Sequence, residues 1–276
     1  MLTQLASDLT DLVLPTTCAG CAAERLPLRY GACGACVTEL EGLTPHPTAP
    51  TPPPRNMPPC TALGAYAGAL RGALLAYKEK GRHRLAIPLG ALLAETVAVA
   101  VARGGGGDFG VPLTVVPVPS TRSAARARGG DHMARLAGHA VRRLRRAGWN
   151  AEVRSPLRAL SRPDSASLDV AGRAAAAESS LRIRGARIRI PRRRPTMRGT
   201  LIVVDDIVTT GATLAAVTVR LQEADMQVTG AAVLAATRLR GVRGLGRGEG
   251  GAPVAPGPEV LAHVPRTRGD GRPSAR

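Results

Sequence analysis

The sequence predicts an α/β fold, with a parallel sheet flanked by helices, preceded by a small cysteine-rich unit. Three observations support this prediction. Between residues 61 and 240, stretches with apolar residues at helical spacing alternate with short apolar runs. The run Leu201–Asp205 is continuously apolar until it ends in an acid, as expected of a parallel strand buried on both faces. Two Cys-x-x-Cys pairs lie close together near the N-terminus.

Length and composition exclude wholesale disorder. The chain has 276 residues and is 44% hydrophobic, enough for one domain of ordinary size plus an appendage. It has only three Tyr, one Trp and one Phe, so its core must consist of Ala, Leu, Val and Ile. No aromatic platform for stacking bases can be built from so few rings, which argues against a single-strand-binding protein.

The formal net charge of +18 leaves two interpretations open. A strongly basic chain usually attracts a polyanion, which favours weak, non-specific contact with DNA. However, all 38 basic residues except Lys78 and Lys80 are Arg, and Ala, Gly and Pro are abundant. Such a skew is typical of a GC-rich coding bias, so the same charges also fit ordinary solvated faces.

Changes in composition divide the chain into four parts. Residues 1–43 hold four of the five cysteines. Residues 44–60 are proline-rich and predict an extended, semi-rigid linker. Residues 61–240 carry the α/β pattern. Residues 241–276, rich in Gly, Pro and Arg, predict a disordered basic tail.

Within the α/β part, apolar spacing predicts four helices and three strands. The helices are expected over Tyr66–Tyr77, Leu85–Arg103, Met133–Leu144 and Leu214–Ala224, and the strands over Leu113–Val118, Leu201–Asp205 and Val228–Ala235.

The sequence also predicts a cytoplasmic protein with no membrane span. The segment Met1–Leu14 lacks the basic residues of a secretory signal. The longest apolar stretch, Leu85–Ala102, is rich in Ala and contains Pro88 and Glu95. These features favour a buried helix over a transmembrane one.

The cysteine pairs predict a structural zinc site. Cys18 and Cys21 form one pair and Cys33 and Cys36 the other, with eleven residues between the pairs. Two such turns can place four thiolates tetrahedrally around one Zn²⁺, which then replaces a hydrophobic core. Structural disulfides and a redox pair are the alternatives, and the lack of an export signal argues against disulfides. Cys60 stands apart and is interpreted as a spare buried thiol.

The most informative segment is Leu201–Leu214, which reads L-I-V-V-D-D-I-V-T-T-G-A-T-L. A hydrophobic strand delivers Asp205 and Asp206 to the edge where open α/β sheets bind ligands. The loop that follows, Thr209, Thr210, Gly211, Ala212 and Thr213, opens a helix and can surround a phosphate with N–H groups and hydroxyls. Because the two acids can accept hydrogen bonds from vicinal hydroxyls, a sugar 5-phosphate fits both halves. The alternative is an N-capping acid pair before a Thr-rich turn.

This segment resembles the phosphoribosyl pyrophosphate (PRPP) motif of type I phosphoribosyltransferases. More widely, residues 12–238 resemble the ComF family (ComFC or GntX type), phosphoribosyltransferase-like proteins with an N-terminal zinc finger that are associated with DNA uptake. The two cysteine pairs match the family's finger. Lys78, in A-Y-K-E-K-G-R-H-R-L, matches the family's lysine segment, with an exposed helix-end lysine as the alternative.

The resemblance extends to a second loop. Val115–Ser120, V-V-P-V-P-S, is similar to the family's strand and pyrophosphate loop, which implies that Val118, Pro119 and Ser120 contact PRPP. Arg128 falls in the basic turn that follows, where a guanidinium can pair with pyrophosphate oxygens. Where the family has R-G-F-N-Q, this chain reads R-G-G-D-H and ends in His132. The amide side chains of two later family elements are replaced by Ser165 and Ala176.

The resemblance implies Mg²⁺-dependent displacement of pyrophosphate from PRPP by a nitrogen nucleophile, with Asp205 and Asp206 as catalytic residues. Proteins of the DNA-uptake machinery are the implied partners. A second hypothesis is a protein that binds PRPP without turnover and regulates a partner. A third is direct, salt-sensitive contact with DNA phosphates through the finger, the basic helix and the tail.

Overall fold

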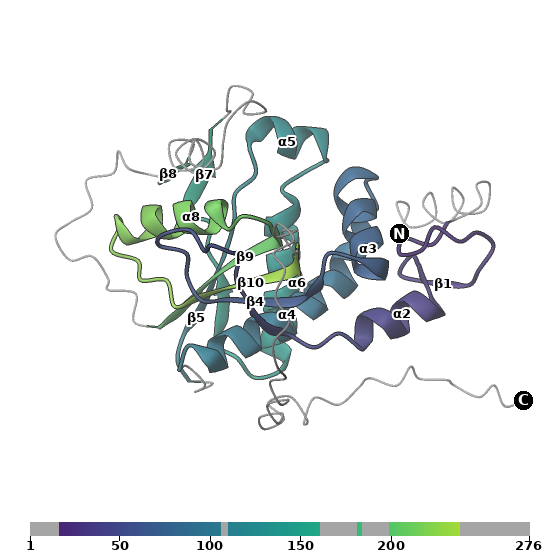
Figure 1. Cartoon of the computed structure of the whole chain (residues 1–276), viewed down its shortest axis with the longest axis horizontal. Helices are drawn as coiled ribbons and strands as arrows, with labels where there is room; N and C mark the ends of the chain where they lie inside the picture. The colour runs from purple at the N-terminus through teal and green to yellow at the C-terminus, as the bar shows by residue number, and fades with distance from the viewer. Residues whose placement is uncertain (1–16, 106–109, 161–180, 184–198, 238–276) are drawn as a thin grey trace, which may run out of the picture. The chain divides into compact units, whose positions relative to one another are not determined.

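The computed structural model describes residues 17–105, 110–160, 181–183 and 199–237 (Figure 1). Its centre is a six-stranded sheet in the order β3-β4-β10-β9-β5-β6. The strands are β3 (His46–Thr48), β4 (Cys60–Ala65), β10 (Gly230–Ala236), β9 (Thr200–Val208), β5 (Leu113–Pro117) and β6 (Ala151–Val153). All neighbours pair in parallel except β3, which runs antiparallel to β4. The predicted α/β fold with a mostly parallel sheet is therefore confirmed.

Helices cover both faces of this sheet (Figure 1). On one face, α4 (Ala86–Arg103) packs against β4, β9 and β10, and α6 (His132–Arg146) packs against β5, β6 and β9. On the other face, Leu201 and Val203 of β9 share a buried cluster with Leu214 and Val217 of α8 (Ala212–Gln222). Successive residues of β9 thus point into opposite layers, as the twofold repeat of a strand requires.

The remaining elements are short. Helix α3 (Gly68–Glu79) and the 3₁₀ turn η1 (His83–Leu85) follow β4, and α5 (Arg122–Ala127) follows β5. An antiparallel pair, β7 (Leu157–Ala159) and β8 (Leu181–Ile183), lies next to α8. The N-terminal unit consists of β1 (Leu28–Arg29), β2 (Ala32–Cys33) and α2 (Gly34–Glu41).

The predicted helices and strands are present, with boundaries that shift by a few residues. The strand predicted to end at Asp205 continues to Val208, so the two acids lie inside β9 and not after it. The extension arises because Ile207 and Val208 continue the strand pairing, with Val208 opposite Ala236 of β10.

The proline-rich segment differs from the predicted spacer. His46–Thr48 forms the edge strand β3, and β4 begins at Cys60. Pro47 is tolerated here because an edge strand does not need every N–H for pairing. Pro50, Pro54 and Met57 lie against Gly211 at the start of α8. The predicted tail, residues 241–276, lies outside the described residues, as do Ser165 and Ala176.

One stretch of the described chain, His83–Arg103, is long and apolar enough to cross a membrane. Its apolar surface is used inside the fold, since 61% of the most hydrophobic window is buried and α4 packs against the sheet and α6. This agrees with the prediction of a buried core helix.

Candidate functional site

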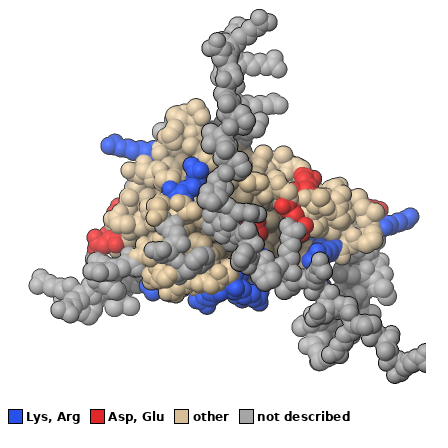
Figure 2. Space-filling view, turned by 90° about the horizontal axis from the view of Figure 1, so that it is seen from below, with Lys and Arg blue, Asp and Glu red and all other residues tan. Residues whose placement is uncertain are grey.

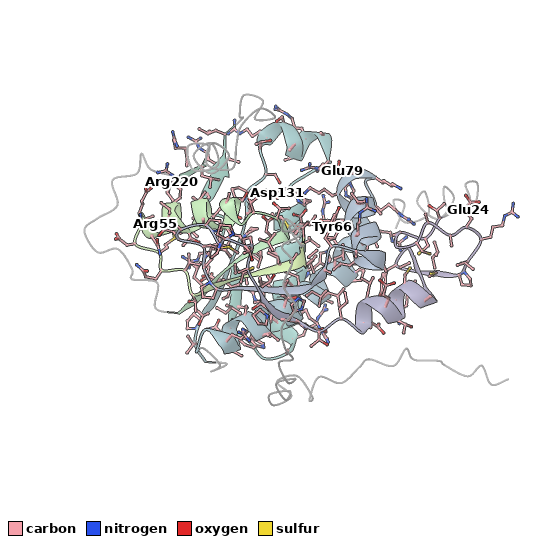
Figure 3. All side chains as sticks on the ribbon, viewed as in Figure 1. Glu24, Arg55, Tyr66, Glu79, Asp131 and Arg220 are labelled. Carbon is pink, nitrogen blue, oxygen red and sulfur yellow. The ribbon has the colours of Figure 1, made fainter. Side chains whose placement is uncertain are left out.

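A pocket of about 330 Å³ opens beside the carboxyl-terminal halves of β5 and β9. Tyr66, one of the residues that line this pocket, is labelled in Figure 3. Its wall comes from segments far apart in the sequence: Tyr66, Lys78, Val118, Pro119, Ser120, His132, Met133, Asp205, Asp206, Ile207, Thr209 and Thr237. The structure thus places Lys78, the Val118–Ser120 loop, both acids and Thr209 around one cavity.

The two acids diverge because they are neighbours on a strand. Asp206 points toward α3 and α6, where its Oδ2 accepts a hydrogen bond from Lys78 Nζ at 2.7 Å. Asp205 accepts a hydrogen bond on Oδ1 from the Asp206 backbone N–H at 2.9 Å. Lys78 was expected at this site from the sequence, but its ion pair with a residue 128 positions away comes from the fold alone.

The environments of the two carboxyl groups shift their pKa values in opposite directions. Burial raises the pKa of Asp206, but the contacts with His132 and Lys78 outweigh it and hold the pKa well below its usual range. Burial and the charge of Asp206 together raise the pKa of Asp205. One acid therefore stays firmly ionised, whereas its neighbour resists ionisation, a pattern that is common in functional sites.

These shifts predict that Asp205→Asn stabilises the fold. Because the folded state raises this pKa, ionised Asp205 costs stability at neutral pH, and the cost disappears once both folded and unfolded states are protonated. We expect the variant to melt above the wild type near pH 7, with the difference shrinking toward about pH 4. Thermal unfolding at a series of pH values measures this. Glu223→Gln, a change of an exposed carboxylate, is the matched control. An Asp205→Asn variant that melts lower than wild type at neutral pH would contradict this prediction.

His132 also lines the pocket, although it belongs to none of the predicted ligand-binding motifs. It is the first residue of α6, and its Nδ1 lies 3.2 Å from Ser120 Oγ. Its Nε2 lies 3.3 Å from Asp206 Oδ2, and Tyr77 OH donates to its backbone carbonyl oxygen at 2.8 Å. The only sequence signal for His132 is that it ends the segment R-G-G-D-H, where this chain departs from the family's R-G-F-N-Q.

The loop between β9 and α8 has the form of an anion-binding turn. Gly211, the N-cap of α8, has a left-handed backbone with φ of 74°. The N–H of Ala212 donates to Thr210 Oγ1 at 3.4 Å, and Thr209 is exposed at the pocket. Thr210, Gly211, Ala212 and Thr213 continue from Thr209 into the first turn of α8 without lining the pocket themselves. A helix N-terminus of this kind can bind an anion through its first backbone N–H groups, which is the role that the sequence predicts for this loop.

We expect Gly211→Ala to disrupt this loop. A Cβ at this position would lie 2.5 Å from Met57 Sδ, and the left-handed backbone costs a non-glycine residue about 1–2 kcal/mol. The variant should melt at a lower temperature and lose affinity for phosphate-bearing ligands. Gly148→Ala, at another glycine with positive φ but with open space around it, serves as the control for backbone strain alone. Equal effects of the two variants would contradict a specific role of the loop packing.

Arg128 lies outside the pocket wall. It ends α5 and forms an ion pair with Glu79, with Nη2 and Oε1 3.6 Å apart. Glu79 is the neighbour of Lys78 on α3, so this pair links the basic turn to the helix that delivers the lysine. The contact of Arg128 with pyrophosphate oxygens stays a prediction.

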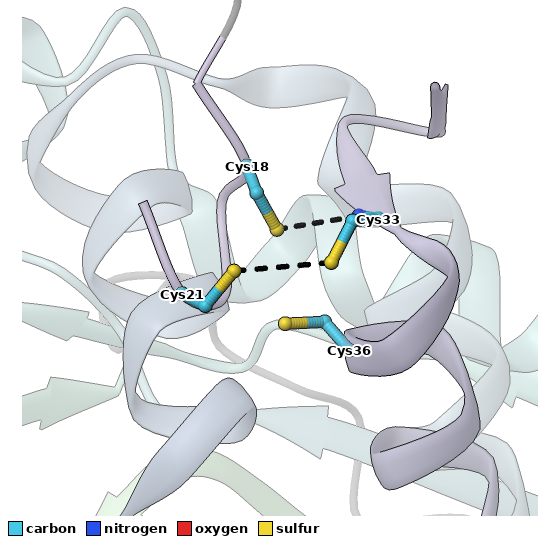
Figure 4. Close-up of side chains that lie close together, drawn as sticks. All are labelled: Cys18, Cys21, Cys33 and Cys36. Atoms are coloured by element: carbon cyan, nitrogen blue, oxygen red, sulfur yellow. Dashed lines mark hydrogen bonds between the residues drawn. The ribbon is translucent and has the colours of Figure 1, made fainter. Parts of the chain in front are cut away.

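The four N-terminal cysteines converge on one point (Figure 4). The Sγ atoms of Cys18, Cys21, Cys33 and Cys36 all lie within 4.8 Å of one another. The Sγ atoms of Cys21 and Cys33 are 3.8 Å apart, the separation of about 3.8 Å that follows from a tetrahedron with metal–sulfur bonds of about 2.3 Å. The geometry is therefore compatible with a structural metal such as Zn²⁺.

Backbone groups favour the thiolate form of one of these cysteines, Cys18. The N–H groups of Gly20 and Cys33 donate to Cys18 Sγ at 3.4 and 3.2 Å. Burial raises the pKa of the Cys18 thiol, but the backbone donors outweigh it and lower the pKa to about 6. A lowered pKa favours the thiolate, which is the form that binds metals.

The cysteine unit packs directly onto α3. A side chain added at Gly72 would collide with the backbone carbonyl of Gly20, so the first cysteine turn lies against the helix backbone. Arg82 Nη1 donates to the Thr17 carbonyl at 2.7 Å, and the N–H of Ala69 donates to Glu39 Oε1 at 2.8 Å. The metal site and the helix that carries Lys78 are thus in physical contact.

Comparison with known proteins adds no assignment. No protein-family model matches this chain, and no curated protein matches its sequence.

Proposed function

We propose that this protein binds Mg²⁺–PRPP in the pocket and transfers its phosphoribosyl group to a nitrogen acceptor, as a ComF-type phosphoribosyltransferase-like protein. The observation that carries this proposal is the convergence of the acid pair, Thr209 at the start of the loop before α8, and the Pro119–Ser120 turn on one cavity at a sheet edge. This is the place where α/β sheets bind nucleotides and sugar phosphates. Resemblance to the PRPP motif supplies the identity of the ligand.

The pocket residues have separable roles in this proposal. Lys78 and His132 both contact Oδ2 of Asp206. Within the described part of the chain, these contacts leave Oδ1 of Asp206 for a ribose hydroxyl. Asp205, with its raised pKa, lies beside the same pocket as a second partner for the ribose. The loop that begins at Thr209 would hold the 5-phosphate, and Ser120 would lie beside the pyrophosphate, with which Mg²⁺ enters as part of the substrate.

Catalysis in this proposal is mainly positioning and electrostatics. The bond from C1 to the pyrophosphate oxygen breaks as the acceptor nitrogen approaches, and positive charge develops on the ribose. Asp206 stays ionised and is held in a partly buried site, where it stabilises such charge better than water does.

We further propose that the cysteine cluster holds a structural Zn²⁺. Four sulfur ligands close the coordination sphere, so the ion would stabilise the unit and take no part in transfer. The protein would act in the cytoplasm, with proteins of the DNA-uptake machinery as partners.

Direct DNA binding receives no added support from the face of the molecule seen in Figure 2. In the view from below, Lys and Arg side chains lie at several separate places with acidic residues between them (Figure 2). Non-specific DNA binding usually relies on a continuous basic patch or stripe.

Calorimetric titration of the zinc-loaded protein with PRPP and Mg²⁺ tests the proposal. We expect saturable binding with Kd between about 1 μM and 1 mM, the usual range for enzyme substrates. Phosphorus NMR of the same sample reports released pyrophosphate when a nitrogen nucleophile is added. Binding without pyrophosphate would favour a PRPP-sensing protein, and the absence of binding by the folded protein would contradict the proposed site.

A further inference from the structure

We propose that Ser120, His132 and Asp206 form a proton relay that takes up the proton lost by the nucleophile during phosphoribosyl transfer. This inference rests on the proposed function. It names a general base for the nucleophile, a role that the PRPP motif assigns to no residue. The three residues come from the turn after β5, the start of α6 and the carboxyl-terminal half of β9, so only the fold brings them together.

The three groups form a continuous chain. Ser120 Oγ lies 3.2 Å from His132 Nδ1, within hydrogen-bond distance. The other ring nitrogen, Nε2, is buried, makes no hydrogen bond of good geometry, and lies 3.3 Å from Asp206 Oδ2. A hydroxyl, an imidazole and a carboxylate in this order are the components of a Ser-His-Asp relay.

The exposure of the three side chains sets the order in which a substrate meets them. Ser120 is partly exposed and lines the pocket, whereas the side chains of His132 and Asp206 are only 9% and 8% exposed. A bound substrate therefore meets the serine hydroxyl first. The imidazole and the carboxylate lie behind it, away from bulk water.

The hydrogen-bond pattern assigns the protons. If Ser120 donates to Nδ1, neutral His132 carries its proton on Nε2, which faces the Asp206 carboxylate. Lys78 on the same Oδ2 keeps that carboxylate ionised, so Asp206 stabilises the imidazolium without taking its proton. Other charged groups close to this assembly are Asp205 of β9, Asp131, which is the N-cap of α6, and Arg135 of α6.

The step balances without any further reactant. The nucleophile's lone pair forms the bond to C1, and the bond from C1 to pyrophosphate breaks, with its electron pair leaving on the pyrophosphate. The nucleophile's proton passes to Ser120 Oγ while the serine's own proton passes to His132 Nδ1. The resulting imidazolium faces Asp206 and later returns its proton to solvent by the same path.

A purely structural role of His132 at the start of α6 would not need its imidazole ring. Tyr77 already fixes the start of α6 through the His132 carbonyl, and Asp131 caps the helix through the N–H groups of Met133 and Ala134. Neither bond uses the imidazole ring. The ring can therefore be replaced without removing the contacts that hold the helix start.

The test compares wild type with His132→Gln, Ser120→Ala and the control His46→Gln, which changes an exposed histidine on β3. Each protein is titrated with Mg²⁺–PRPP, and pyrophosphate release is followed across pH with hydroxylamine and with water alone as nucleophiles. We expect His132→Gln to bind PRPP within about threefold of wild type but release pyrophosphate about 10²–10⁴-fold more slowly, with the acidic limb of the pH profile lost. Ser120→Ala should also slow release, and His46→Gln should match wild type.

A second readout does not depend on activity. Nitrogen-15 NMR of the ring, assigned through His132→Gln, should show neutral His132 with the proton on Nε2 and with Nδ1 unprotonated. The opposite tautomer, or a His132→Gln variant with wild-type rate and pH profile, would overturn the relay. If wild type binds PRPP but releases no pyrophosphate with either nucleophile, the relay falls while the PRPP site stands. If wild type does not bind PRPP, the proposed function falls with it.

Discussion

Replacing Asp205 and Asp206 together with Asn is expected to weaken Mg²⁺–PRPP binding at least about 30-fold. Asp206 stays ionised, and a hydrogen bond from a ribose hydroxyl to a charged group contributes about 1.5–3 kcal/mol, whereas a hydrogen bond to Asp205, whose pKa is raised, contributes about 0.5–1.5 kcal/mol. The two losses total about 2–4.5 kcal/mol, or roughly 30- to 2,000-fold in affinity. Asn has nearly the same size as Asp, so the pocket keeps its shape. Calorimetric titration under the conditions of the wild-type experiment measures the loss.

A control with the same charge change separates the site from general electrostatics. Glu152→Gln/Glu223→Gln also removes two negative charges, but from residues outside the pocket wall: Glu152 is partly exposed, Glu223 is exposed, and each pairs with a nearby arginine. This control should bind Mg²⁺–PRPP like wild type. If the two double variants lose affinity equally, or if the aspartate variant binds normally, the ribose role of the acid pair is contradicted.

The sequence predicted most of the fold because the apolar pattern of each element reflects its own burial. Leu201 to Val204 are buried on both sides, which makes the strand visible as an unbroken apolar run. The basic face of α6 alternates with the buried Met133, Leu136, Ala137, Ala140 and Leu144, so its helical period is equally clear. Local patterns of this kind need no knowledge of the partner.

The parts that escaped prediction depend on long-range contacts. Edge strand β3 lies in a proline-rich segment, where composition favours an extended linker and no apolar alternation marks a strand. His132 gives no local signal of function, because Ser120 and Asp206 reach it from other elements. In the same way, Lys78 could be matched to a motif by its neighbours, but nothing near it in the chain indicates Asp206 as its partner.

Removal of the metal is expected to unfold the N-terminal unit and to weaken the PRPP site from a distance. The unit has two-residue strands and one short helix. Its buried apolar residues outside the cysteines are few and small: Ala19, Ala32 and Leu40. Structural zinc contributes about 10–16 kcal/mol in finger peptides, far more than such a core can. Chelation, or Cys36→Ser, should therefore abolish stoichiometric zinc and the protection of residues 17–43 against hydrogen exchange.

The consequence for the pocket follows from the contact between the unit and α3. Gly20 lies against Gly72, and Arg82 reaches the Thr17 carbonyl, so loss of the unit leaves one side of α3 without its packing partner. Lys78 belongs to that helix, and its contact with Asp206 requires the helix to stay in place. We expect faster hydrogen exchange in α3 and weaker Mg²⁺–PRPP binding after zinc loss, while β5, β9 and α6 keep their protection. Cys60→Ser, which changes the cysteine outside the cluster, should retain both zinc and affinity. Unchanged exchange in residues 17–43 and in α3 after complete zinc removal would show that the metal does not support this part of the fold.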